Sequence, residues 1–322
     1  MPIVRTNVPM TAQLCDETIQ RLVQTYPSCR SEILTESAFG RPIRTLVIGE
    51  GSRKVIYTAA HHANEWITAP VILKFVEELA QAIVSGGVIF GVNARELAAR
   101  ATIYTIPMVN PDGVDLVTGA LQPEDGQYEA AAALSQNYPA IPFPDGWKAN
   151  LLGTDLNLNY PAGWLMARQI KFSQGYTRPG PRDYVGRWPL DQKETTALAG
   201  YTEFIDPELV LAYHSQGRVI YWQFGDIFVP GARALAEQFA RLSGYELEDT
   251  PYTSAFAGYK DWFIKLFRKP GFTIEVGEGI NPLPLSQFDR IYRDNLGILV
   301  TAALGLQLSE EDDRIDPANT KE

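Results

Sequence analysis

The sequence is short of cysteine and of basic residues, and each shortage excludes a class of protein. Only two cysteines, Cys15 and Cys29, occur among 322 residues, too few for the disulfide framework of a small secreted domain. We expect both thiols to be reduced. Lys and Arg number 28 against 38 Asp and Glu, giving a formal net charge of −10. Nucleic acids and anionic membrane surfaces are therefore excluded as partners, because both need a basic protein surface.

Long hydrophobic runs are also missing. No apolar stretch approaches the roughly 20 residues of a membrane span. The start, "MPIVRTNVPMTAQLCDET", lacks the cationic stretch and apolar core of a secretory signal. We therefore expect a cytoplasmic protein with no membrane partner. Hydrophobic residues at 45% and charged residues at 20% are ordinary for a globular chain, and only the acidic tail, residues 309–322, has the composition of a disordered segment.

The pattern of strands and helices predicts one α/β domain over residues 1–308. Residues 43–49 and 54–60 are β-rich runs separated by "EGSR", and we expect them to pair as a hairpin. Further strands are predicted at 101–109, 208–214, 218–224 and 271–276, and helices at about 66–85, 190–204, 230–243, 259–268 and 285–306. This alternation predicts a mixed sheet with helices on both faces.

Two irregular features interrupt this pattern. "NPDG" at 110–113 predicts a turn after the strand at 101–109. Residues 117–189 are rich in Pro, Gly, Asn and aromatic residues and show little periodicity. A long irregular stretch inside a compact domain is usually functional, so we expect this insert to form part of a substrate site.

Histidine is scarce as well, and two of the three histidines stand together in "YTAAHHANEWITAP". Glu65 follows His62 by three residues where a predicted strand gives way to a helix, a spacing that suits zinc ligation. His61 has Asn64 at the same spacing, and a neutral amide is a poor zinc ligand. The third histidine, His214, closes another predicted strand in "LVLAYHSQG". The sequence thus predicts a metal site at strand ends, with His61 as a neighbour.

Two further segments strengthen this prediction, since H-x-x-E alone is common by chance. Glu275 lies in a third predicted strand, "GFTIEVG", with glycines clearing space beyond it. "GTDLNLNY" at 153–160 carries one Asp and two Asn that can orient ligands or substrate. A serine nucleophile in "HSQG" is disfavoured, because no histidine is left to act as its base.

Taken together, "HHANEW", "NPDG", "DLNLNY", "AYHSQG" and "FTIEVGEG" occur in an order and spacing that resemble the zinc carboxypeptidases, over about residues 12–305. The resemblance implies a single-domain, mixed, twisted sheet of about eight strands. It also implies a hydrolase, a zinc metallopeptidase with one Zn²⁺ per chain. A binding module without zinc is disfavoured, because the metal-binding and catalytic positions are intact.

The resemblance implies a role for individual residues. It makes His62, Glu65 and His214 the zinc ligands, Glu275 the general base, Asp155 the hydrogen-bond partner of the first zinc histidine, Asn157 a substrate-binding residue, and Lys148 the counterpart of an arginine that polarises the scissile carbonyl. Lysine keeps the positive charge but not the two-pronged geometry of arginine. The implied mechanism is hydrolysis by metal-activated water, with Glu275 accepting its proton.

Two departures from the family concern the substrate. True carboxypeptidases carry an arginine after the substrate-binding asparagine, where it clamps the terminal carboxylate through two hydrogen bonds. Leu158 occupies that position here and makes none. Asn64 replaces an arginine often found inside the H-x-x-E quartet. An ordinary carboxypeptidase is therefore disfavoured.

The combination "HHANEW", "WKAN" with "DLN", and "FAGYKDWFI" resembles instead the bacterial branch that cleaves the γ-D-glutamyl–meso-diaminopimelate bond of peptidoglycan peptides. The alternatives are a zinc carboxypeptidase of other specificity, or a zinc amidase or deacylase acting on small acylated amino acids. Recycling and sporulation both stay open as the pathway.

Some positions stay open in this interpretation. The candidates to replace the missing clamp are Arg168, Arg178, Arg182, Arg187 and Arg218. Tyr252 matches the family's mobile tyrosine before "DW" better than Tyr259 does, with one inserted residue. Glu278 is expected to be a loop carboxylate and not a second base.

Overall fold

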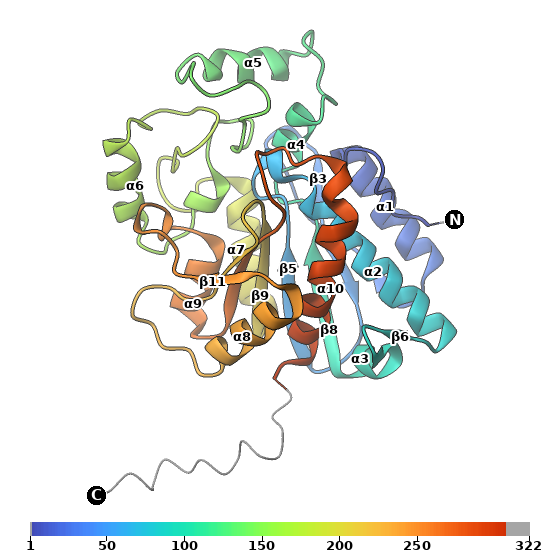
Figure 1. Ribbon diagram of the computed structural model, residues 1–322. Coiled ribbons are helices and arrows are strands. Elements are labelled where there is room, and N and C mark those ends of the chain that lie inside the picture. Colours follow the sequence, from blue (N-terminus) through green and yellow to red (C-terminus); the bar gives the residue numbers. More distant parts are fainter. Residues whose placement is uncertain (1, 307–322) are drawn as a thin grey trace, which may run out of the picture.

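An eight-stranded mixed sheet forms the centre of the computed structural model, which describes residues 2–306 (Figure 1). The strand order is β1–β4–β8–β5–β9–β12–β10–β11. The bounds are β1 (Cys29–Arg30), β4 (Leu46–Ile48), β5 (Arg53–Thr58), β8 (Ala101–Ile106), β9 (Leu209–His214), β10 (Val219–Tyr221), β11 (Glu246–Glu248) and β12 (Gly271–Glu275). Strands β8, β5, β9 and β12 run parallel, while β4 and β10 are antiparallel to their inner neighbours. The predicted mixed α/β sheet is confirmed.

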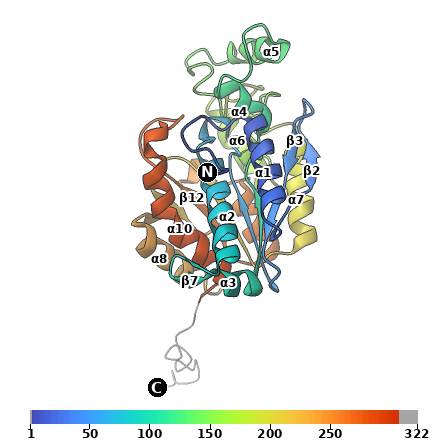
Figure 2. The same ribbon diagram turned by 90° about the vertical axis from the view of Figure 1, so that its right-hand side faces the viewer.

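Helices cover both faces of this sheet. One side carries α1 (Ala12–Thr25), α2 (Thr68–Ser85), α3 (Ala94–Arg100), α8 (Ala232–Ser243) and α10 (Phe288–Leu304), and the other carries α7 (Lys193–Ile205) and α9 (Tyr259–Phe267). Figure 2 shows α1, α2 and α10 in front of the sheet. Successive residues of a strand point to opposite faces of the sheet. Tyr57 therefore packs in the core on the side of α2 and α10, while Ile56 packs in the core on the side of α7 and α9.

The predicted hairpin between residues 43–49 and 54–60 is wrong. Strand β8 lies between β4 and β5, and β5 pairs in parallel with both β8 and β9. A hairpin would place β4 and β5 side by side and antiparallel, whereas both neighbours of β5 are parallel to it. Parallel neighbours along the chain are joined by a crossover connection, which usually contains a helix. Here α2 and α3 provide that crossover from β5 to β8. The remaining hairpins are small: β2 (Ile33–Glu36) with β3 (Pro42–Arg44), and β6 (Val88–Ile89) with β7 (Val92–Asn93).

The "NPDG" segment begins a helix and does not simply turn the chain. The side chain of Asn110 accepts a hydrogen bond from the Gly113 N–H (3.1 Å) and caps α4 (Pro111–Val117), with Pro111 at its first position. The insert at 117–189 is also less irregular than expected, because it contains α5 (Gly126–Ser135) and α6 (Trp164–Ser173). Figure 1 shows α5 above the sheet, apart from the helices that cover its faces.

Other expectations have simpler outcomes. Cys15 and Cys29 are both buried free thiols. Between residues 2 and 306 no helix has the combination of length and apolar character that crossing a membrane requires. The predicted acidic tail at 309–322 lies outside the described residues.

Candidate active site

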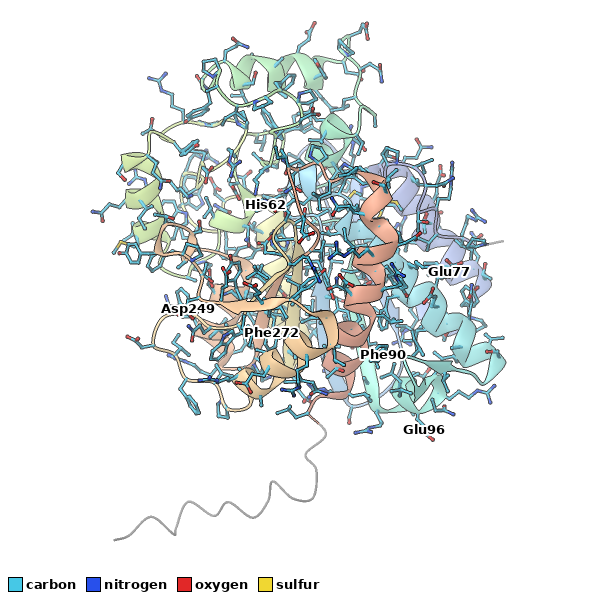
Figure 3. The ribbon with its side chains drawn as sticks, viewed as in Figure 1. His62, Glu77, Phe90, Glu96, Asp249 and Phe272 are labelled. Carbon is cyan, nitrogen blue, oxygen red and sulfur yellow. The ribbon has the colours of Figure 1, made fainter. Side chains whose placement is uncertain are left out.

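The candidate site lies where three neighbouring parallel strands end. The chain leaves β5 at Thr58 and reaches His61 three residues later and His62 four residues later. His214 is the last residue of β9, and Glu275 is the last residue of β12. His214 and Glu275 are paired across the two strands. The carboxyl ends of parallel strands share one edge of a sheet, which is where open α/β sheets bind ligands. Figure 3 shows His62 at this end of the sheet.

His62, Glu65 and His214 form one buried group that can hold a metal ion. Nδ1 of His62 lies 2.9 Å from Oε1 of Glu65, and Nδ1 of His214 lies 2.9 Å from Oε2 of the same carboxylate. The two Nδ1 atoms are 3.2 Å apart. Candidate ligand atoms of all three residues lie within 4.8 Å of one another. Two imidazoles and a carboxylate are a donor set that zinc prefers.

The start of α2 holds Glu65 in place. Thr68, the first residue of the helix, accepts a hydrogen bond from the Ala60 N–H (3.0 Å) and donates its hydroxyl to the Glu65 carbonyl (2.7 Å). The N–H of Ser215 donates to Glu65 Oε2 (3.1 Å). The carboxylate is thereby fixed between strand ends that are about 150 residues apart in sequence.

The hydrogen bonds around His62 fit a cation at this position. Its Nε2 lies 3.1 Å from Asp155 Oδ1, and a carboxylate can only accept, so Nε2 carries the hydrogen. The Nδ1 lone pair then faces the Glu65 carboxylate, and two acceptors 2.9 Å apart require a proton or a cation near them. Burial alone lowers the pKa of His62, but Glu65 and Asp155 outweigh it and raise the pKa to about 9. A divalent cation would supply the same compensation.

Three groups of the site, Glu65, Asp155 and Lys148, are held in their charged forms. Burial tends to raise the pKa of Glu65 and of Asp155, but His62 and Lys148 overcome it and lower both pKa values. Lys148 Nζ lies 3.0 Å from Glu65 Oε1. Burial alone would lower its pKa, yet Glu65 above all and Glu275 raise it. Lys148 therefore brings a fixed positive charge beside the metal-binding group.

Glu275 differs from the other carboxylates of the site. Burial raises its pKa to about 8, the negative charge of Glu65 adds to the effect, and Lys148 and His62 oppose it. A carboxyl group whose pKa lies near neutral pH can take up and release a proton at physiological pH. Glu275 therefore differs from Glu65 and Asp155 in exchanging a proton close to neutral pH.

His61 and Asn64, which have the same spacing as His62 and Glu65, have different partners in the structure. His61 is buried, with Nε2 3.3 Å from the Tyr160 hydroxyl and its ring stacked 5.6 Å from that of His214. Asn64 turns away in the short 3₁₀ turn at 63–65 and donates to the Asp145 carbonyl (3.0 Å). His61 therefore packs behind the metal-binding group and lies outside it.

A cleft runs past Glu275 in two directions. One cavity, of about 220 Å³, lies next to His62 and is lined by Asn157 and Leu158, among others. A second, of about 750 Å³, includes Asn64 and residues 140–146 of the insert. Both cavities share Lys148, Arg182, Tyr221 and Glu275. The candidate base thus lies between two spaces that can hold the two sides of a cleaved bond.

The five candidate arginines differ in whether they line the cleft beside Glu275. Arg182 lines both cavities. Arg168 lies over the rings of Trp164 and Phe172, Arg187 over that of Trp188, and Arg218 near Glu278 and Asp294. Neither cavity is lined by these three or by Arg178.

Tyr252 is not brought to the candidate base. Its side chain is 64% exposed, its hydroxyl faces Met166 Sδ at 3.6 Å, and its ring packs against Phe256. It lines an adjacent hollow and not the cavity that contains His62. Glu278 is exposed in a loop and lies 3.3 Å from Arg290, as expected for a loop carboxylate.

Sequence reasoning missed two ion pairs in the wall of the smaller cavity. Lys171 Nζ lies 2.6 Å from Asp183 Oδ1, and Lys260 Nζ lies 2.5 Å from Asp261 Oδ1. The second pair was readable in part, because "GYKDW" places adjacent opposite charges at the start of a predicted helix. The first pair joins α6 to a loop twelve residues away, and no local pattern marks it.

Comparison with known proteins gives a consistent result. A family model described as zinc carboxypeptidase matches residues 15–297. The chain is 42% identical over 284 residues to gamma-D-glutamyl-L-diamino acid endopeptidase 1 of Lysinibacillus sphaericus, covering 88% of this chain and 69% of that one. It is 34% identical over 288 residues to the uncharacterized protein YqgT of Bacillus subtilis strain 168, covering 88% and 74%.

Solved structures support the fold. Carboxypeptidase A from Helicoverpa armigera superposes with a TM-score of 0.71 at 17% identity, over 94% of this chain and 75% of that one. That identity bears on the fold alone, whereas the family model spans most of the chain. The protein is a hydrolytic enzyme that belongs to the zinc carboxypeptidase family.

Proposed function

We propose that this enzyme is a zinc metallopeptidase that hydrolyses the γ-D-glutamyl–meso-diaminopimelate bond of peptidoglycan peptides. The observation that carries the proposal is Leu158, which lines the cavity beside His62 as a buried apolar residue packed near Trp164 and Val185. It offers no hydrogen bond where ordinary family members hold the terminal carboxylate. The 42% identity to an endopeptidase named for γ-D-glutamyl-L-diamino acid bonds supports the same substrate class.

We assign one Zn²⁺ to His62, Glu65 and His214. The fit rests on the converging Nδ1 atoms and on the Asp155 hydrogen bond, which leaves the His62 lone pair facing the group. When bound, zinc lowers the pKa of water and polarises the scissile carbonyl. Asp155 keeps His62 in the required tautomer, a role typical of such partners of metal-bound histidine.

The chain's own residues then move the proton and balance the charge. Glu275, at the end of β12, accepts the proton of the attacking water and passes it to the leaving amine. Lys148, whose Nζ lies 3.0 Å from Glu65 Oε1, stabilises the negative charge that develops on the carbonyl oxygen. Both side chains are partly shielded from solvent, which strengthens these interactions because less water screens them.

The cleft on each side of Glu275 is assigned to the two parts of the substrate. The insert wall at 140–146 faces the γ-D-glutamyl side, and Asn157 and Leu158 face the diamino acid. Arg182 lines both spaces, so we assign it the substrate carboxylate nearest the scissile bond. Tyr252 borders the neighbouring hollow, and we assign it to the rim of the binding site.

The test is incubation of the zinc-loaded enzyme with L-Ala-γ-D-Glu-meso-diaminopimelate, an N-blocked dipeptide carboxypeptidase substrate and an N-acylated amino acid, with products identified by mass. We expect free diaminopimelate from the first and little reaction with the others. The Glu275→Gln variant controls for contaminating peptidases. Cleavage of the dipeptide alone would make the enzyme an ordinary carboxypeptidase, and cleavage of the acylated amino acid alone would favour the amidase alternative.

A further inference from the structure

We propose that Asn110, the first residue of "NPDG", is a positioning residue that fixes Lys148 beside the metal-binding group. The assignment rests on the proposed function, because it gives a structural cause for the role of Lys148. Asn110 is buried, and its Oδ1 caps α4 by accepting a hydrogen bond from the Gly113 N–H. The cap uses only this oxygen, so both hydrogens of the amide nitrogen Nδ2 are free for other partners.

The amide nitrogen of Asn110 faces backbone carbonyls from two distant segments of the chain. Its Nδ2 donates to the carbonyl oxygens of Ala149 (3.0 Å), His61 (3.1 Å) and Lys148 (3.3 Å). His61 is 49 residues from Asn110 in sequence, and Ala149 is 39 residues from it. One side chain therefore joins the metal-binding loop, residues 61–65, to the segment that carries Lys148.

Lys148 depends on such contacts because no helix or strand holds it. Its four-carbon side chain is flexible, so the place of Nζ depends on a fixed backbone. The N–H of Lys148 donates to the Pro181 carbonyl (2.7 Å), and its own carbonyl accepts from the Ala63 N–H (3.0 Å) as well as from Asn110. Nζ then lies 3.0 Å from Glu65 Oε1.

Gly113 allows these two segments to approach the start of α4. A Cβ at Gly113 would lie 2.6 Å from the Ala149 carbonyl oxygen and 2.8 Å from the Ala63 Cβ. Gly113 lies within α4 and does not have a positive φ, so it contributes space and not an unusual backbone conformation. Both the first and the last residue of "NPDG" are thus fitted to the same contact.

The helix that Asn110 caps is itself anchored on another side. Asp112 is buried, and its Oδ1 accepts from the Ser37 hydroxyl (2.8 Å) and from Arg41 Nη1 (2.7 Å), while its Oδ2 accepts from the Phe39 N–H (3.2 Å). A functional group is placed more precisely when the element that supports it is rigid. Asn110 therefore transmits a fixed position from α4 to the Lys148 segment.

The first test is Asn110→Ser, because serine is a good helix cap but lacks the amide donor. We expect kcat to fall about 10-fold with little change in KM, since a small displacement of a catalytic group is costly. Zinc content should stay near one per chain. Asn93→Ser is the matched control, because Asn93 caps α3 at an exposed position and should leave kcat unchanged. The assay uses whichever of the three substrates above the enzyme cleaves.

Two results would overturn the assignment. A folded Asn110→Ser variant with wild-type kcat would show that the amide does not position Lys148. Loss of zinc from this variant would show that Asn110 acts through the metal ligands instead.

The second test combines Asn110→Ser with Lys148→Gln. If Asn110 acts through Lys148, kcat of the double variant should lie within about 2-fold of Lys148→Gln alone, because residues that act through one another are not additive. A full further loss of about 10-fold would instead indicate general structural damage and overturn the assignment. If Lys148→Gln alone has wild-type kcat, the role of Lys148 in the proposed function fails, and this assignment with it.

Gly113→Ala tests the same contact if Asn110→Ser does not fold by circular dichroism. Alanine favours a helix over glycine, so any loss of activity comes from displacement of Ala149 and not from a weakened α4. We expect kcat to fall about 10-fold at full zinc content, with little further loss in the Lys148→Gln background. Wild-type kcat in Gly113→Ala would contradict the assignment.

Discussion

Asp155 and His62, 93 residues apart, are joined by a 3.1 Å contact between Oδ1 and Nε2 on the side of the ring away from Glu65. This contact determines which nitrogen of His62 is free to bind a metal. It also joins the insert, which carries Asp155, to the edge of the sheet. The insert is thus part of the candidate site and more than a cover over it.

Asp155→Asn should weaken zinc binding about 10- to 100-fold, because the amide no longer stabilises the ligating histidine with a negative charge. Competition with a chelator of known affinity would measure the dissociation constant. Asp289→Asn, at an exposed position at the start of α10, is the control and should bind zinc like wild type. Unchanged affinity in the Asp155 variant would exclude the contact from metal binding.

Replacing a ligand should remove the metal altogether. We expect about one zinc per chain in the wild type and almost none in His62→Ala or His214→Ala, because two ligands hold zinc poorly. His61→Ala is the control, since His61 packs behind the group and should leave the zinc content near one. Elemental analysis of dialysed protein would measure the zinc content per chain. Full zinc content in both ligand variants would contradict the assignment of His62 and His214 as zinc ligands.

Glu275→Gln should keep the zinc and lose turnover by about 100- to 10,000-fold, because it removes the base and preserves the shape of the side chain. Glu278→Gln, three residues later in an exposed loop, should retain normal turnover. Steady-state kinetics on the diaminopimelate peptide would compare the two. A Glu275 variant as active as wild type would be incompatible with its role as the base.

Lys148→Gln should lower kcat about 100-fold with a smaller change in KM, because the positive charge acts mainly on the developing oxyanion. Lys148→Arg restores the charge and should recover most of the activity. The split between kcat and KM, measured together with zinc content, separates this role from damage to the metal site. A purely raised KM would instead indicate a role in substrate binding.

Glu194 gives a prediction about stability. Burial raises its pKa from 4.5 to about 7, so between these pH values the folded state binds more protons than the unfolded state. The contribution of Glu194 to the free energy of unfolding therefore falls as the pH rises from 4.5 to 7. Above pH 7 its charged form lowers that free energy by about 3 kcal/mol. Glu194→Gln should be more stable than wild type at pH 8 and show little difference near pH 4.5.

Urea unfolding of wild type and variant at both pH values would measure this difference. Glu203→Gln, at an exposed position on the same helix α7, is the control and should show no such dependence on pH. An equal difference in unfolding free energy at both pH values would show that Glu194 does not titrate in this window.

Much of the fold could be predicted from the sequence because periodicity is local. The helix α2 and the strands β9 and β12 lie within a few residues of their predicted ranges. Strand neighbours were harder, since nothing in residues 43–60 shows that β8 enters between the two strands. "NPDG" was misassigned because the same residues that favour turns also cap and begin helices, and only packing distinguishes the two outcomes.

The sequence by itself determined the local part of the site. His62 and Glu65 are three residues apart at the end of a strand, and their spacing alone brings them within reach of one ion. The tertiary structure alone decided which distant groups join them: Asp155 behind His62, Arg182 among five arginines, and a cavity wall with two buried ion pairs. The reason is physical, because chain geometry fixes contacts over a few residues, whereas the packing of helices and loops against the sheet fixes the rest.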